Sequence, residues 1–245
     1  MSGPLVTTWL GRQPYLEAWR LQEAVASRVR RGGPDRLLLL EHDPVYTIGK
    51  RGTTDHLLAS PRELREAGAH VYRVDRGGDI TYHGPGQLVG YPILTVPGKR
   101  GGGMADTVAY VRSVEQLLID VLADLGLTDV GRVEGLAGVW VAPASDGIAA
   151  RPEEGKTGVW VDLPDGRPAK VAAIGVRVSR GVTSHGFALN VSTDLAAFGR
   201  MIPCGFAHEV ASLARLGVQV TPLEVGLRCA DELAQRLGRS LAWTE

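Results

Sequence analysis

The polar run Arg76–Gln87, which reads RGGDITYHGPGQ, constrains the fold more than any other segment, because it holds four glycines and a proline between two strand-like segments. Ordering glycine is entropically costly and offers no side-chain packing in return, so such a run shapes backbone against a ligand. We predict a ligand-facing loop here, flanked by strands over residues 71–75 and 88–94. The alternative is a tight hairpin turn built on Asp79 and the glycines.

Helix and strand patterns are interleaved along the chain without regular alternation. Apolar spacing predicts helices over residues 14–31 and 106–125, the second capped by Asp106. Thr221-Pro222-Leu223-Glu224 combines a threonine cap, an early proline and a glutamate, so it predicts another helix start. Further helices are expected from about 194 and 207, and strands over 37–40, 138–142, 158–163, 171–178 and 187–191. This order predicts an α+β (mixed α/β) fold and argues against a doubly wound parallel sheet.

The length of 245 residues suits one large domain, and we expect a single domain spanning residues 1–245. Residues 142–158 are rich in alanine, glycine, proline and charge, which predicts a surface insertion. They separate two near-copies, Gly138-Val139-Trp140-Val141 and Gly158-Val159-Trp160-Val161. Two copies of four residues are too few to establish an architectural repeat.

Composition excludes several classes of function. Acidic and basic residues balance at 27 each, so no long-range field points to a nucleic-acid partner or an anionic membrane. The N-terminus lacks a signal-peptide pattern and no long apolar window occurs, so we expect a cytoplasmic protein without a membrane partner. The two cysteines form no CxxC pair, so no metal site is predicted. P-loop, dinucleotide-binding and Gly-x-Ser-x-Gly motifs are absent from the sequence.

Two residues are candidates for catalysis. Cys204 lies in a turn before the helix expected near His208, where a helix N-terminus would stabilise a thiolate. A lone cysteine is more often a small buried hydrophobe, and Cys229 is expected to be one. Lys170 opens an apolar strand, and alternation places it on the same face as Ala172, Ile174 and Val176. If that face is the core side, burial lowers the lysine pKa or the lysine meets an anionic partner such as a thiolate; the alternative is an edge lysine that snorkels to water.

The glycine run carries further polar candidates. Its backbone N–H groups, with Arg76 and His83, would cradle an oxygen-bearing ligand or a developing oxyanion. His83 can orient Cys204, contact the substrate or hold the loop, and His185 can support the site from behind. The other histidines are expected to be surface or structural residues: His42, His56, His70 and His208.

Four motifs, taken together and in order, resemble the octanoyltransferases of lipoate biosynthesis, the lipoate-protein ligase B family. They are Arg76-Gly77-Gly78 with Thr81–Gln87, Lys170–Gly175, His185–Asn190 and Pro203-Cys204-Gly205. The resemblance implies the cofactor-transferase fold shared with biotin and lipoate ligases, a mixed sheet flanked by helices. It also implies that Cys204 is the acyl-thioester nucleophile and that Lys170 activates it and moves protons. The acyl substrate would then be lined by Arg76, Gly77, Gly78, Asp79, Ile80, Thr81, Tyr82, His83, Ala173, Ile174, Gly175, Gly186, Phe187 and Ala188.

The same resemblance implies a reaction and its partners. Octanoyl-acyl carrier protein would donate the acyl group to Cys204. The acceptors would be lysine amines of lipoyl domains in 2-oxoacid dehydrogenase complexes and of the glycine-cleavage H protein, with no cofactor, ATP or metal required. Burying a medium acyl chain is worth on the order of 5 kcal/mol, which favours it over acetyl. The alternatives are an ATP-dependent lipoate or biotin ligase, in which Cys204 is dispensable, and a non-catalytic protein that binds acyl chains or carrier domains.

Overall fold

The computed structural model describes residues 3–96, 98–99, 103–141, 159–160, 168–202 and 209–244. Its helices are α1 (Tyr15–Arg30), α2 (Pro61–Glu66), α3 (Thr107–Asp124) and α4 (Pro222–Leu237), with 3₁₀ turns η1 (Thr54–His56) and η2 (Leu195–Arg200). Its strands are β1 (Leu5–Gln13), β2 (Arg36–His42), β3 (Val45–Ile48), β4 (His70–Arg73), β5 (Ile80–His83), β6 (Gln87–Ile93), β7 (Gly98–Lys99), β8 (Gly103–Ala105), β9 (Val130–Val133), β10 (Leu136–Val141), β11 (Val159–Trp160), β12 (Ala169–Ser179), β13 (Val182–Asn190), β14 (Glu209–Val210) and β15 (Leu241–Thr244).

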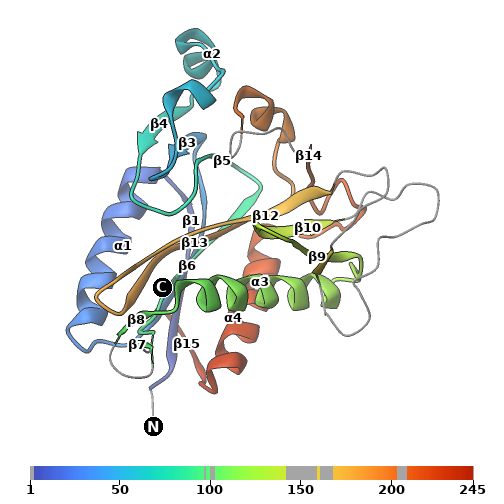
Figure 1. Cartoon of the computed structure of the whole chain (residues 1–245). Helices are drawn as coiled ribbons and strands as arrows, with labels where there is room; N and C mark the ends of the chain where they lie inside the picture. The colour runs from blue at the N-terminus through green and yellow to red at the C-terminus, as the bar shows by residue number, and fades with distance from the viewer. Residues whose placement is uncertain are drawn as a thin grey trace.

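A ten-stranded sheet forms the centre of the molecule, in the order β11-β9-β10-β12-β13-β6-β2-β1-β15, with β14 pairing β12 off this path (Figure 1). The middle strands β12, β13, β6 and β2 pair antiparallel, whereas β1 pairs β2 and β15 in parallel. The sheet is therefore mixed, as the irregular order of elements predicts. The α+β class is confirmed.

Helices cover both faces of this sheet. On one face, α1 packs Ala18, Val25 and Val29 against Leu38 and Leu40 of β2. On the other, α3 and α4 close a larger core that includes Leu118, Val121 and Val225. No helix in the described part of the chain is long and apolar enough to cross a membrane.

The capping residues read from the sequence correctly predict where α3 and α4 begin. The Asp106 side chain accepts hydrogen bonds from the amides of Val108 and Ala109 and so begins α3 as predicted. Thr221 and Glu224 form a reciprocal capping box at the start of α4. Cys229 is a core residue of α4, only 1% exposed, and burial raises its pKa to about 12.

A second, three-stranded sheet holds the glycine run, in the order β4-β3-β5. Part of the run is a strand, β5, so the prediction of one continuous loop over residues 76–87 is wrong. Ile80, Thr81 and Tyr82 pair with β3. Their strong preference for strand structure prevails over the low strand propensity of the neighbouring glycines. The loop proper is confined to residues 74–79 and to 84–86.

Two other predicted elements differ from the structure. The helix expected from about residue 207 is not there in the described residues, because Glu209 and Val210 form strand β14 beside β12. The segment from about 194 is a short 3₁₀ turn, η2, with Asp194 as its cap. The proposed insertion at 142–158 lies outside the described residues.

Candidate active site

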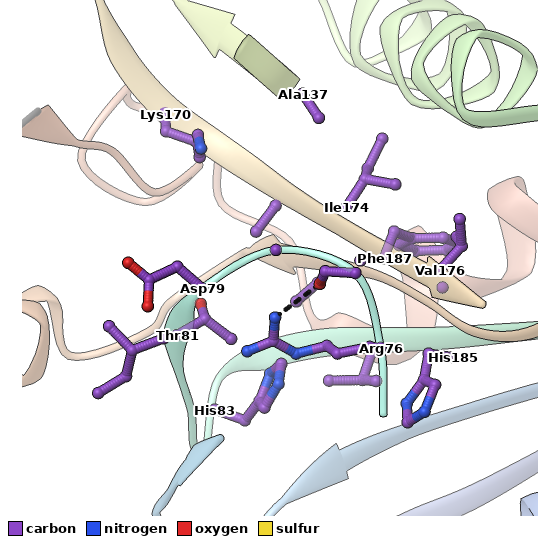
Figure 2. Close-up of a pocket in the computed structure, with 18 of the residues that line it drawn as sticks. Arg76, Asp79, Thr81, His83, Ala137, Lys170, Ile174, Val176, His185 and Phe187 are labelled. Carbon is purple, nitrogen blue, oxygen red and sulfur yellow. Dashed lines mark hydrogen bonds between the residues drawn. The ribbon is translucent and has the colours of Figure 1, made fainter. Parts of the chain in front are cut away.

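A cavity of about 610 Å³ opens between β12, β13 and the glycine run. Figure 2 shows Lys170 and Ile174 on β12, with Ala137 on one side of this strand and Arg76 and His83 on the other. Most of the predicted substrate-binding residues line it: Arg76, Gly77, Gly78, Asp79, Ile80, Thr81, His83, Ala173, Ile174, Gly175, Gly186, Phe187 and Ala188. Lys170 also lines it, so the structure brings motifs separated by about a hundred residues to one wall.

Tyr82 is the one predicted lining residue that does not face this cavity. Its ring packs against Tyr46 and Phe198, within a separate cluster under the small sheet. Its neighbours Thr81 and His83 line the cavity, as does Ile80 at the start of β5. In this structure Tyr82 packs under the small sheet, and its part in substrate binding stays a prediction.

Arg76 holds the glycine run in shape. Its buried guanidinium donates to the Thr47 carbonyl at 2.7 Å and to the Gly77 carbonyl at 2.9 Å, the second bond being drawn in Figure 2. The run is also joined to residues 49–51, because Gly49 donates to the Asp79 carbonyl and Lys50 to the Arg76 carbonyl.

The backbone N–H groups expected to cradle a ligand are partly used inside the protein. Gly77 donates its N–H to the Val176 carbonyl at 3.0 Å. Gly86 donates to the Glu41 carboxylate at 2.6 Å. These two amides therefore fix the loop to the sheet, and a ligand cradle would have to use other donors of the run.

His83 belongs to a chain of buried polar side chains. Its Nδ1 lies 2.7 Å from the Oε1 atom of Gln87, an acceptor, so Nδ1 carries the proton. Gln87 in turn donates to Asn190 Oδ1 at 2.9 Å, and Asn190 donates to the Ala211 carbonyl at 3.0 Å. Of the three roles considered for His83, holding the loop is directly visible, and its ring also lines the cavity.

Two buried histidines of this region are held neutral. Burial lowers the pKa of His83 to about 3, with nearby His42 adding to the effect. Burial likewise lowers the pKa of His42 to about 4, and its Nε2 lies 2.7 Å from the Tyr91 hydroxyl. His42 is thus a structural residue, as predicted, but a buried one.

These histidines make stability depend on pH. Both pKa values lie below the ordinary value of 6.5, so the unfolded chain binds more protons than the folded protein below about pH 6.5. The free energy of unfolding should therefore fall as the pH drops from 7 to 5, by on the order of 2 kcal/mol per histidine. Urea titrations at the two pH values measure this. A His42→Gln variant with the same pH dependence as the parent would contradict it.

Lys170 lies beside β10, where its Cα pairs with that of Trp140. The pairing register shifts between Val139 and Trp140, so β12 has a bulge at Val171 and simple alternation fails there. Ala172 is buried in the core cluster and does not line the cavity, whereas Lys170, Ala173 and Ile174 do. The expectation that Lys170 and Ala172 share a face is therefore wrong.

The first Gly-Val-Trp-Val copy is the one next to the lysine. Gly138–Val141 lies in β10, which pairs directly with β12. Val159 and Trp160 of the second copy form β11, which pairs with β9 at the end of the sheet.

Cys204 lies outside the described residues, but the chain on both sides of it is attached to the cavity. Ile202 donates its N–H to the carbonyl of His56, a cavity-lining residue, at 2.8 Å. Val210 pairs with Lys170, and Ala211 donates to the Lys170 carbonyl at 3.0 Å. The described residues on either side of Cys204 therefore contact two different residues of the same cavity, His56 before it and Lys170 after it.

Several cavity residues were missed from the sequence. His56 was expected to be surface or structural, yet it lines the cavity with its Nδ1 2.5 Å from Oδ2 of Asp79. Tyr15 of α1 lines it as well, and nothing in its local sequence indicated this. His185, expected to support the site from behind, is buried but lines the cavity itself. Its Nε2 lies 2.7 Å from Oδ1 of Asp75, and this hydrogen bond lowers the pKa of Asp75.

A pair of glycines lets the strands approach at the cavity. Gly175 and Gly186 are cross-strand partners, and a Cβ at Gly186 would lie 2.1 Å from the Gly90 carbonyl oxygen. Because that neighbour is backbone, Gly186→Ala should destabilise the protein by about 3 kcal/mol or more. Thermal unfolding measures this, with Gly199→Ala as control because nothing lies within 4 Å of its added carbon. Equal melting temperatures for the two variants would refute the argument.

The fold and the cavity together define a class. The mixed sheet matches the archaeal bipartite lipoate protein ligase of Thermoplasma acidophilum with a TM-score of 0.70 at 18% identity, covering 100% of this chain and 86% of that one. At this identity the likeness concerns the fold, which is that of the lipoate ligases.

The sequence comparisons are more specific. The family model for the lipoyl protein ligase A/B catalytic domain matches residues 14–234, and the chain belongs to this family. It is 47% identical over 240 residues to the octanoyltransferase of Mycolicibacterium smegmatis, covering 96% of this chain and 90% of that protein. It is 44% identical over 227 residues to that of Solibacter usitatus, covering 92% and 90%.

Proposed function

We propose that this protein transfers an octanoyl group from octanoyl-acyl carrier protein to a lipoyl domain, through a thioester on Cys204. It is an acyltransferase of the octanoyltransferase class, as its relatives at 44% to 47% identity are. The observation that supports the mechanistic part is that the described residues flanking Cys204 contact the lining of one cavity: Ile202 bonds to His56, and Val210 and Ala211 bond or pair with Lys170.

The chemistry proposed for the first half-reaction begins at Cys204. Its thiolate attacks the carbonyl carbon of the donor thioester, the bond to the carrier sulfur breaks, and the carrier thiolate takes a proton from the Lys170 ammonium. One thioester replaces another, so this step is nearly isoenergetic. Apolar residues of β12 and β13, including Ile174 and Phe187, would hold the acyl chain.

In the second half-reaction the acceptor lysine amine attacks the acyl-cysteine. The carbon–sulfur bond breaks, an amide forms, and the Lys170 amine takes the proton that the acceptor nitrogen loses. Cys204 is released as a thiolate and Lys170 as an ammonium, so both return to their starting forms. Amide formation from a thioester runs downhill, which is why the proposal includes no ATP.

The proposed reaction also implies acceptor proteins and a cellular location. We take the acceptors to be lipoyl domains of 2-oxoacid dehydrogenase complexes and the glycine-cleavage H protein, and the location to be the cytoplasm. We also propose that residues 1–245 form one domain, with 142–158 as a surface insertion between β10 and β11.

The test is the intact mass of the protein after incubation with octanoyl-acyl carrier protein in the absence of ATP. One octanoyl adduct, released when a lipoyl domain is added, is the expected result. Modification of the lipoyl domain that requires ATP and free acid, without an adduct, would instead identify a ligase. Binding of the acyl carrier with no modification of any kind would identify a non-catalytic binding protein.

A further inference from the structure

An aromatic ring contacts the lysine on which the proposed function rests. The Lys170 Nζ atom lies 4.4 Å from the centre of the Trp140 ring, and the two residues are cross-strand partners. Trp140 is only 1% exposed, so its ring is fixed by the surrounding core. A cation over an indole face is attracted by the ring quadrupole, and the attraction strengthens where water is excluded. The ring therefore holds the ammonium at a definite place.

The stem of the lysine lies against a glycine of the neighbouring strand β10, two residues before Trp140. A Cβ at Gly138 would lie 3.3 Å from Lys170 Cε and 2.6 Å from the Ala172 carbonyl oxygen. Gly138 also has φ +126°, a conformation that side chains other than glycine rarely adopt. The absence of a side chain at residue 138 thus leaves the path along which the Lys170 side chain reaches the Trp140 ring.

A buried carboxylate fixes that glycine. Glu115 of α3 is 0% exposed, and its Oε1 accepts the Gly138 N–H at 3.1 Å. Its Oε2 accepts from Arg132 Nε at 2.9 Å and from Arg112 at 2.8 Å. Burying a carboxylate is costly even when it is paired, so its retention at this place calls for a reason. The reason we find is geometric: Glu115 joins α3 to the part of β10 over which Lys170 lies.

We propose that Trp140 and Glu115 are positioning residues for Lys170. Glu115 holds the backbone at Gly138, which sets the place of the Trp140 ring two residues on, and the ring holds the ammonium. Neither residue exchanges a proton with the substrate. This inference rests on the proposed function, because it concerns the lysine that the proposed reaction uses.

The first test is the rate of acyl-enzyme formation in a single turnover with octanoyl-acyl carrier protein. Trp140→Leu should lower the maximal rate about tenfold, which lies between the values typical of exposed and of desolvated cation–π contacts. The donor concentration at half-saturation should stay the same, because the ring contacts the lysine and not the donor. Trp140→Phe keeps an aromatic face and should recover most of the rate.

Trp9→Leu is the matched control for lost packing. Trp9 is a partly buried residue of β1 that packs against the core closed by α3 and α4 and does not line the cavity. The Trp9→Leu substitution should lower the melting temperature while leaving the single-turnover rate unchanged. Circular dichroism of each variant confirms that the comparison is made between folded proteins.

The second test is a double-mutant cycle between Glu115→Gln and Trp140→Leu. If Glu115 acts through the ring, Glu115→Gln should lower the rate about threefold in the parent and have little effect once the ring is gone. Effects that multiply independently would overturn the role of Glu115. Equal rates for Trp140→Leu and Trp140→Phe, or a loss seen only in donor saturation, would overturn the role of Trp140.

The outcomes also separate this inference from the proposed function. A parent protein that forms no octanoyl adduct without ATP would overturn the proposed function itself. An adduct that forms in the parent, is lost in Lys170→Ala and forms at the parental rate in Trp140→Leu would overturn only the positioning role.

Discussion

Replacing Cys204 with serine should abolish the octanoyl adduct and lower transfer to a lipoyl domain by roughly 10⁴-fold or more, as loss of a covalent nucleophile does elsewhere. A serine hydroxyl is far less acidic than a thiol, so Lys170 cannot keep it ionised as it would a thiolate. An ester on serine would also be a poorer acyl donor to an amine than a thioester. Intact mass spectrometry detects the adduct, and the rate of lipoyl-domain octanoylation measures the transfer.

The second cysteine of the chain supplies the matched control. Cys229 is buried in α4, and its raised pKa of about 12 keeps it as a neutral thiol. Cys229→Ala should therefore keep the octanoyl adduct, with at most a loss of stability. An adduct that survives in Cys204→Ser and disappears in Cys229→Ala would overturn the assignment of the nucleophile.

Acyl carriers should be discriminated by chain length, with octanoyl transferred about 10³-fold faster than acetyl at low donor concentration. The six methylenes that octanoyl has beyond acetyl are worth about 5 kcal/mol when fully buried, at about 0.8 kcal/mol each. The cavity offers them apolar walls, among them Ile174, Phe187 and Leu136. The acyl chain is not fully buried in the transition state, so only part of the roughly 5 kcal/mol is realised there. The preference in kcat/KM should therefore lie somewhat below the ratio that about 5 kcal/mol would give.

The measurement is a competition between acetyl and octanoyl carriers for one lipoyl domain, read by mass. Ala173 lines the cavity, so the larger side chain of Ala173→Leu should reduce the space for the acyl chain. The preference should then shift towards shorter acyl chains. Comparable transfer of acetyl and octanoyl groups by the parent would refute an apolar acyl cavity as the basis of selection.

The features predicted correctly depend on short stretches of sequence. Asp106 and Thr221 act as helix caps because capping involves residues within one turn. The cavity-facing residues of the glycine run and of Ala173–Gly175 follow from motifs that the family resemblance supplies. Tyr82 lies in the same motif without lining the cavity, because its ring packs against Tyr46 of the paired strand β3 and Phe198 of η2.

What the sequence did not reveal depends on pairing between distant segments. Strand β14 forms where a helix was expected, because Glu209 and Val210 find partners in Ala169 and Lys170 about forty residues earlier. The bulge at Val171 similarly depends on the register of β10 against β12. His56 reaches the cavity because its segment bonds to residues 200–202. Such pairings leave no local periodicity from which to infer them.

The antiparallel ladder of β10 and β12 has a consequence for how this protein can change during evolution. Residues 142–158 follow β10 and precede β11, and the registers of these two strands are set by their own pairing, β10 with β12 and β9, and β11 with β9. The entropic cost of closing a loop grows only with the logarithm of its length. Insertions and deletions over residues 142–158 should thus accumulate freely among descendants of this gene, while substitutions at Gly138, Trp140 and Lys170 are removed by selection.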